Sequence, residues 1–145
     1  MSRAQWITGL IGLLLAAALP GIGHLARRVP AGRCALDGVA IEPLYRVRVV
    51  DGAGGSHIFC GIRCARRWID RQGERPRTVY VTDEAGGAEV DAGSAFFVQS
   101  GVLTNPITGN HIHVFRDRER AEEHARSFRG VLLTGANRPF GKDER

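Results

Sequence analysis

Methionine is nearly absent from this sequence, which has only Met1. A metal site in the rest of the chain therefore has no thioether ligand available. The sequence also lacks a basic run joined to stacking aromatic residues, which argues against a nucleic-acid-binding groove even though the net charge of +5 would permit one. Paired catalytic acids are missing too, because Asp83 and Asp91 flank a glycine turn and are most simply turn and strand-end residues. We therefore expect a protein that is not an enzyme and does not bind nucleic acid.

Formally charged residues are absent from Trp6 to Ala26, where only His24 can titrate near neutral pH. About 20 apolar residues cross a bilayer as a helix, whereas the apolar part of a secretory signal needs about 7 to 15. We expect residues 1–26 to form an uncleaved N-terminal membrane anchor, with a cleaved signal as the alternative. Both readings place the rest of the chain outside the cytoplasm, facing the periplasm or the cell exterior, either membrane-tethered or secreted.

Apolar residues in the rest of the chain recur at strand and helix spacing, in an order that occurs twice. Strand, strand and helix are expected in residues 45–72, where Val47 and Val49 alternate with arginines, and again in residues 95–130. The fold class is therefore α+β, with helices laid on antiparallel hairpins. We predict a linker at 27–33, one domain at 34–135, a helix at 61–72, a helix at 116–130 closed by Gly130, and a disordered tail at 136–145.

The sharpest chemical signal is a set of three cysteines, Cys34, Cys60 and Cys64. An odd number of thiols in an oxidising compartment invites mispairing unless something occupies them. Residues four apart share a helix face, so Cys60 and Cys64 can point to one spot at a helix N-terminus, where the dipole favours thiolate. Thiolates select Cu(I), Zn(II) or Hg(II) over hard cations. Three nearby arginines favour thiolate further: Arg63, Arg66 and Arg67.

Two simpler interpretations of the cysteines remain open. Cys34 could form a structural disulfide with Cys60 or Cys64, which would leave one thiol over. All three cysteines could instead be buried and chemically inert. We favour a metal–thiolate site, because its spacing and its position at a strand-to-helix corner suit convergent ligands.

Two histidines could supplement the thiolates. His111 and His113 are two residues apart on an expected strand, so they share a face, although that face could simply be the solvent side of an edge strand. His124 lies among the apolar positions of the last expected helix and is a core or boundary residue. Asp37 precedes a glycine, at a position where aspartate hydrogen-bonds its own backbone in a turn.

Several segments, in this order, resemble the NosL family of nitrous-oxide-reductase accessory proteins: CALDGVAI, HIFCGIRCARRWI, VYVTD, VDAGSAFFVQSG, NPITGNHIHVF and RDRERAEEHA. The resemblance extends from about Cys34 to Gly130, and its first half is also similar to small TRASH and YHS metal-binding modules. It implies a copper-binding periplasmic protein, often membrane-attached, that supplies Cu(I) to a recipient such as nitrous oxide reductase. It also implies a fold of two related ββα units, shared with organomercurial lyase.

The sequence departs from that family at its copper ligands. The family motif C-x-x-C-G-M reads here with Asp37 in place of the second cysteine and Val39 in place of the methionine, and a later P-M-G has Ile107 at its centre. Of the Cys- and Met-type site only Cys34 carries over, while Cys60 and Cys64 supply thiolates where the TRASH-like modules have theirs. Three thiolates suit trigonal Cu(I), and with one imidazole they equally suit tetrahedral zinc.

These observations lead to three hypotheses. The preferred one is an extracytoplasmic, membrane-tethered Cu(I)-binding accessory protein that passes its ion to a copper protein by ligand exchange. The alternative is a structural zinc or disulfide module on an anchored interaction domain. A third, which rests on fold analogy alone, is cleavage of carbon–mercury bonds, a reaction that needs thiols and a positioned acid such as Asp37.

Overall fold

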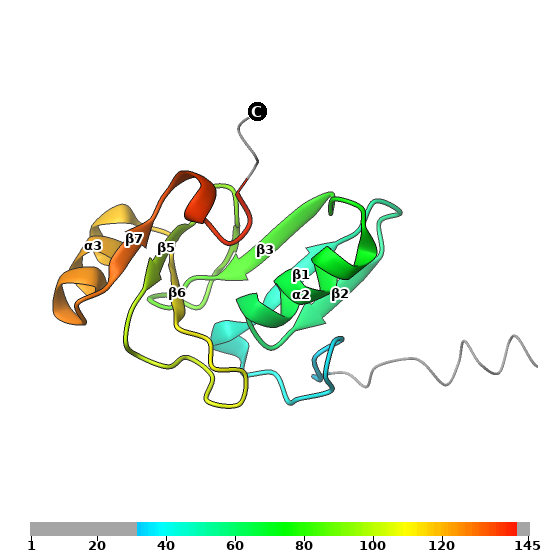
Figure 1. Ribbon diagram of the computed structural model, residues 1–145, viewed down its shortest axis with the longest axis horizontal. Coiled ribbons are helices and arrows are strands. Elements are labelled where there is room, and N and C mark those ends of the chain that lie inside the picture. Colours follow the sequence, from blue (N-terminus) through cyan, green and yellow to red (C-terminus); the bar gives the residue numbers. More distant parts are fainter. Residues whose placement is uncertain (1–31, 142–145) are drawn as a thin grey trace, which may run out of the picture. The chain divides into compact units, whose positions relative to one another are not determined.

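Residues 32–141, which the computed structural model describes, place strands and two helices in an order that occurs twice (Figure 1). The predicted anchor at 1–26, most of the predicted linker and residues 142–145 lie outside these described residues. Between residues 32 and 141 no helix is both long and apolar enough to cross a membrane.

The first repeat consists of β1 (Val47–Val50), β2 (Ser56–Phe59), α2 (Ile62–Gln72) and β3 (Thr78–Thr82). Its strands are antiparallel, with β1 between β2 and β3, and β4 (Glu89–Asp91) extends the sheet beyond β3. Val47 and Val49 are buried while the residues between and after them are only half-buried, which is the period-2 pattern of a sheet covered on one face. That face is covered by α2, which packs on β1 and β2 (Figure 1).

The second repeat consists of β5 (Phe96–Gln99), β6 (Ile112–Phe115), α3 (Arg118–Ser127) and β7 (Val131–Leu133). The strand order is β6-β5-β7, again antiparallel with the first strand in the centre. The structure is thus a mixed α/β fold with two antiparallel sheets and two helices. The strand–strand–helix repeat expected from the sequence is present, and in each repeat a further strand returns to the sheet, giving ββαβ twice.

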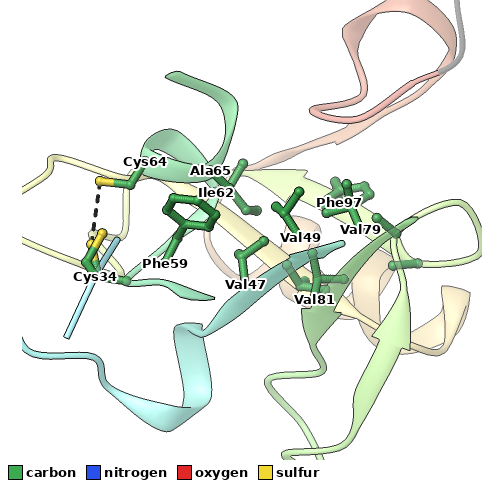
Figure 2. Packing of buried hydrophobic residues seen from close by; sticks show 14 residues of the cluster. Cys34, Val47, Val49, Phe59, Ile62, Cys64, Ala65, Val79, Val81 and Phe97 are labelled. Atoms are coloured by element: carbon green, nitrogen blue, oxygen red, sulfur yellow. Dashed lines mark hydrogen bonds between the residues drawn. The ribbon is translucent and has the colours of Figure 1, made fainter. Parts of the chain in front are cut away.

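The main core joins both repeats, because Phe97 of β5 packs in the same cluster as the residues of the first sheet (Figure 2). From α2 the cluster receives Ile62, Cys64 and Ala65, which are the buried residues of that helix. A smaller cluster lies under α3 and contains Val98, Phe115 and Ala121. The cysteines therefore belong to the larger of the two clusters.

The ends of the two helices differ. Helix α2 stops at Gln72 because Gly73 adopts the left-handed conformation, with φ of 70°. Helix α3 was expected to be closed by Gly130, but the left-handed residue there is Arg129, with φ of 50°. Gly130 is needed for space instead, since a Cβ at this position would lie 2.8 Å from the carbonyl oxygen of Gln99.

The segment at 136–141 corrects the expectation of a disordered tail. A short 3-10 helix covers Gly135–Asn137, and Phe140 packs against the main core with its ring centroid 6.3 Å from that of Phe97. The guanidinium of Arg138 donates hydrogen bonds to the carbonyl oxygens of Ala92, Gly93 and Ala95 at 2.8 to 3.0 Å. These contacts, between residues far apart in the sequence, hold the segment in place.

Candidate metal centre

Three backbone segments bring the cysteines together. Cys34 opens a tight turn in which its amide donates to the carbonyl of Val39 at 2.8 Å, and the amide of Ala35 donates to the carbonyl of Ile58 on β2 at 2.8 Å. The second bond fixes this turn against the edge of the first sheet. Cys60 follows the last residue of β2, and Cys64 lies in the first turn of α2. Figure 2 shows Cys34 and Cys64 at one end of the main core.

The donor atoms of the cluster converge. The sulfur atoms of Cys60 and Cys64 are 3.5 Å apart, and all three cysteines are free thiols. Together with one carboxylate oxygen of Asp37, the three sulfurs all lie within 4.8 Å of one another. A tetrahedral ion about 2.3 Å from each sulfur would hold the sulfurs about 3.8 Å apart. The spacing therefore fits one soft metal ion with only small adjustments.

Burial divides the cluster into a closed side and an open side. The exposed fractions of Cys34, Cys60 and Cys64 are 0%, 1% and 4%, whereas Asp37 is exposed. The thiols thus form the inner wall of the site, and the carboxylate stands at its opening. The exposed carboxylate marks the side from which an ion or an incoming ligand would approach the thiols.

Asp37 performs two tasks with its two carboxylate oxygens. Oδ1 accepts a hydrogen bond from the amide of Val39 at 3.1 Å, which is the turn expected from the sequence. Oδ2 lies 3.1 Å from the sulfur of Cys64 and 4.0 Å from that of Cys60. The sequence interpretation predicted the turn, and it considered Asp37 as a partner of the thiols only in the carbon–mercury hypothesis. A signal was present, because Asp37 occupies the position at which the NosL-type motif has its second cysteine.

Burial favours the protonated form of the Cys60 and Cys64 thiols when no ion is bound. Burial raises the pKa of Cys60 to about 12 and also raises the pKa of Cys64. Although partial burial raises the pKa of Asp37, hydrogen bonds from Cys34, Cys64 and Val39 outweigh this and lower it below its ordinary value. The result is a carboxylate that accepts hydrogen bonds from neutral thiols. Metal binding must then release protons.

This corrects the expectation that the helix N-terminus and its arginines make the thiols acidic. Burial is the largest cause of the raised pKa of both Cys60 and Cys64. The guanidinium of Arg63 is turned away and donates to the carbonyl of Thr108 at 2.7 Å, while Arg66 and Arg67 lie on the exposed face of α2.

The structure does not bring either predicted histidine to the thiols. His113 is buried, and both of its ring nitrogens have other partners: Nδ1 lies 2.8 Å from Glu84 and Nε2 lies 3.2 Å from the carbonyl of Val102. His111 is half-buried and lines a groove beside α2. His124, expected at a core boundary, packs its ring 4.2 Å from that of His113. His113 therefore belongs to a buried polar network in the second repeat.

Comparison with known proteins supports the fold. No known family profile matches the sequence, and no curated protein matches it either. Among solved structures, the copper chaperone NosL from Shewanella denitrificans is similar, with a TM-score of 0.62 and 20% identity, over 82% of this chain and 92% of that chain. The fold of this chain is therefore like that of NosL, and the cluster at Cys34, Asp37, Cys60 and Cys64 is a possible metal site within it.

Proposed function

We propose that this chain is a copper(I)-binding accessory protein that holds its cargo ion between the thiols of Cys34, Cys60 and Cys64. The observation that carries the proposal is the convergence of three buried sulfur atoms at one point, with a carboxylate at the opening. Thiolates are the ligands that favour Cu(I). The likeness of the fold to a copper chaperone supports the same cargo.

The open side of the cluster suggests how the ion is exchanged. Asp37 is a hard oxygen ligand and binds Cu(I) more weakly than a thiolate does. A thiol of an acceptor could therefore replace Asp37 and then displace the buried cysteines one at a time. The same four donors also suit tetrahedral zinc, so a structural zinc module remains the alternative.

The location and the recipient are further parts of the proposal. The apolar segment from Trp6 to Ala26 supports a membrane-tethered protein that faces the periplasm or the cell exterior. The resemblance of the sequence to the NosL family supports delivery to a copper enzyme such as nitrous oxide reductase. Both parts are independent of the metal chemistry and can fail without affecting it.

Metal titration tests the proposal directly. The full chain, reduced, free of oxygen and kept in a mild detergent, is titrated with Cu(I) and separately with Zn(II), and binding and far-UV circular dichroism are followed together. A carrier binds one Cu(I) tightly and keeps its fold without the ion. Folding that depends on zinc would indicate the structural module, because a closed structural site contributes folding energy. Binding of neither ion would overturn the proposal.

Matched variants assign the ligands. Cys34→Ser should abolish tight Cu(I) binding. Asp37→Asn should weaken Zn(II) binding more than Cu(I) binding, because only zinc gains substantially from a carboxylate ligand. Asp91→Asn is the control, since Asp91 is exposed and forms a similar turn by accepting a hydrogen bond from Gly93 at 2.7 Å. Equal effects of Asp37→Asn and Asp91→Asn on zinc would remove Asp37 from the ligand set.

A second candidate function is favoured by the contact between Asp37 and Cys64. Cleavage of a carbon–mercury bond needs thiols that bind mercury and an acid that protonates the leaving carbon. In such a reaction Cys60 would lose its proton to water and bind the organomercury cation, and the thiol proton of Cys64 would pass to Asp37 across 3.1 Å. Asp37 would then protonate the carbon as the carbon–mercury bond breaks, leaving Hg(II) on two thiolates and the hydrocarbon free.

Release of benzene from phenylmercury acetate distinguishes the two candidates. If the chain is a lyase, benzene appears with turnover, and Asp37→Asn abolishes it while mercury is still bound. If the chain is only a carrier, the thiols bind phenylmercury and no benzene is released.

A further inference from the structure

A groove with a volume of about 340 Å³ runs beside α2, outside the metal site. One wall is the exposed side of α2, and the other is the start of β6 with the residues before it. The charged lining residues are three arginines and one aspartate, and Gln99, Asn110 and His111 supply the other polar side chains. The lining residues used below are Arg63, Arg66, Arg67, Asp70, His111 and Ile112.

The arginines of the groove have different partners. Arg63 is held in place, because its guanidinium donates to the carbonyl of Thr108 at 2.7 Å and so joins α2 to the loop before β6. Arg66 and Arg67 are exposed, and among the described residues neither forms a salt bridge with an acidic side chain. Their charges are therefore available to a partner.

The loop joined to Arg63 carries three exposed large apolar side chains, and one of them, Ile107, is the most exposed among the described residues. Val102 is 37% exposed, Leu103 is 48% exposed and Ile107 is 74% exposed. Ile107 lies at the tip of this loop, in a turn where Oδ1 of Asn105 accepts hydrogen bonds from the amides of Ile107 at 2.9 Å and Thr108 at 3.2 Å. An exposed apolar side chain next to free positive charge is typical of a protein-binding surface.

We infer that the groove and the Ile107 tip form a docking surface for an acidic segment of a partner protein. Carboxylates of the segment pair with Arg66 and Arg67, and an apolar residue of the segment packs on Ile107. Charge complementarity selects this occupant, since the lining has an excess of positive charge and a cavity of this size accepts a few side chains. Arg63 directly precedes Cys64, so the groove and the metal cluster share the first turn of α2.

The role of this surface in metal transfer depends on the proposed function, whereas its preference for acidic segments does not. The test uses the full chain in a mild detergent and a fluorescein-labelled peptide that carries glutamates around one leucine, with fluorescence anisotropy as the readout. A second peptide with glutamine in place of every glutamate controls for apolar binding. Cu(I) affinity of each variant is measured in parallel.

The double change Arg66→Glu and Arg67→Glu should weaken binding of the acidic peptide by about tenfold or more. Ile107→Ser should weaken it by about tenfold. Arg71→Glu is the matched control, because Arg71 is exposed on the same helix but does not line the groove, and it should change binding less than about twofold. Cu(I) affinity should stay unchanged in all three variants.

Three results would overturn the inference. The first is that Arg71→Glu weakens peptide binding as much as the double change does, which would mean that binding depends only on the net charge of the protein. The second is equal affinity for the glutamine peptide. The third is an arginine-dependent affinity for anionic phospholipid vesicles without affinity for the acidic peptide, which would assign the surface to a membrane. If the wild-type chain binds the acidic peptide but does not bind Cu(I), the proposed function is refuted and the inference about the docking surface is not.

Discussion

The corner between β2 and α2 and the corner between β6 and α3 occupy equivalent places in the two repeats. Phe59 and Phe115 end the second strands, and Ala65 and Ala121, both 0% exposed, lie at the same distance into the helices. Counted in this way, the places of Cys60 and Cys64 are taken in the second repeat by arginines, Arg116 and Arg120. One backbone frame thus supports a thiol cluster at one corner and a solvated surface at the other.

The comparison extends to a pair of histidines. His57 and His113 each precede the end of a strand by two residues, and each faces a valine of the central strand, Val49 or Val98. His57 pairs with Asp51 at 2.8 Å where both side chains are about one-third exposed. His113 makes a similar contact with a carboxylate while only 3% exposed. The first repeat has thus buried its thiols, and the second has buried its polar network.

The largest effect is expected from removing the aromatic residue at the end of a strand. Phe59→Ala should lower the free energy of unfolding by about 3–5 kcal/mol, because Phe59 is 0% exposed in the main core and the change leaves a cavity. Phe115→Ala should lower the free energy of unfolding by less, since Phe115 is 7% exposed and belongs to the smaller cluster. Urea unfolding of the two variants measures both values. A larger loss for Phe115→Ala would show that the second repeat, not the first, dominates stability.

The metal chemistry should depend on one corner only. Cys60→Ser should weaken Cu(I) binding by more than about 100-fold, because loss of an outer-shell partner alone costs 10- to 100-fold at metal sites. Arg116→Ser, at the equivalent place in the second repeat, should leave the affinity unchanged. Competition with a chromogenic Cu(I) chelator gives both affinities. Binding that survives Cys60→Ser would remove Cys60 from the ligand set.

The sequence predicted the frame better than the site. The strands and the two helices follow from local periodicity, which the chain displays openly in Val47 and Val49 or in Ile62 and Ala65. The double role of Asp37 could not be foreseen from spacing, because one oxygen satisfies the local turn and the other faces thiols distant in the sequence. The acidity expected for Cys60 and Cys64 was wrong for a related reason: burial raises the pKa of both thiols, and burial is a property of the whole fold.

The same limit explains the histidines and the tail. The partner of His113 is Glu84, which follows the end of β3 in the other sheet. No local pattern therefore connects the two residues. Arg138 and Phe140 occur in a polar, glycine-containing stretch that resembles a disordered end. Their contacts are with Ala92, Ala95 and Phe97, and only the folded chain brings these together.

The buried histidine should give the second repeat a pH dependence. Although burial lowers the pKa of His113, the hydrogen bond to Glu84 outweighs this and raises it above its ordinary value. The stabilisation is therefore fully present below about pH 6.5 and is lost as the pH rises through the higher pKa of the folded state. Burial and the nearby charge of His113 lower the pKa of His124, which opposes this trend.

His113→Gln tests this pH dependence. The change should cost about 1–3 kcal/mol at low pH, because it leaves the carboxylate of Glu84 without its charged partner. It should also reverse the slope near neutral pH, since His124 alone then makes stability rise with pH. Thermal unfolding between about pH 5 and 8 measures the slope. His57→Gln is the control at the equivalent place, and an equal change of slope there would contradict the assignment to the buried pair.

The smallest effect concerns the exposed faces of the helices. In α3 the guanidinium of Arg118 donates to Glu122 one turn later at 2.8 Å, whereas the equivalent places in α2 are Ile62 and Arg66. Glu122→Gln should lower stability by about 0.3–0.5 kcal/mol, and by less in high salt, because the pair is solvent-exposed. Arg66→Gln should leave the free energy of unfolding in urea unchanged, and it should weaken binding of the acidic peptide. A stability loss for Arg66→Gln would mean that Arg66 stabilises the fold of the first repeat. Its charge would then have a structural role, like that of the Arg118–Glu122 pair on α3.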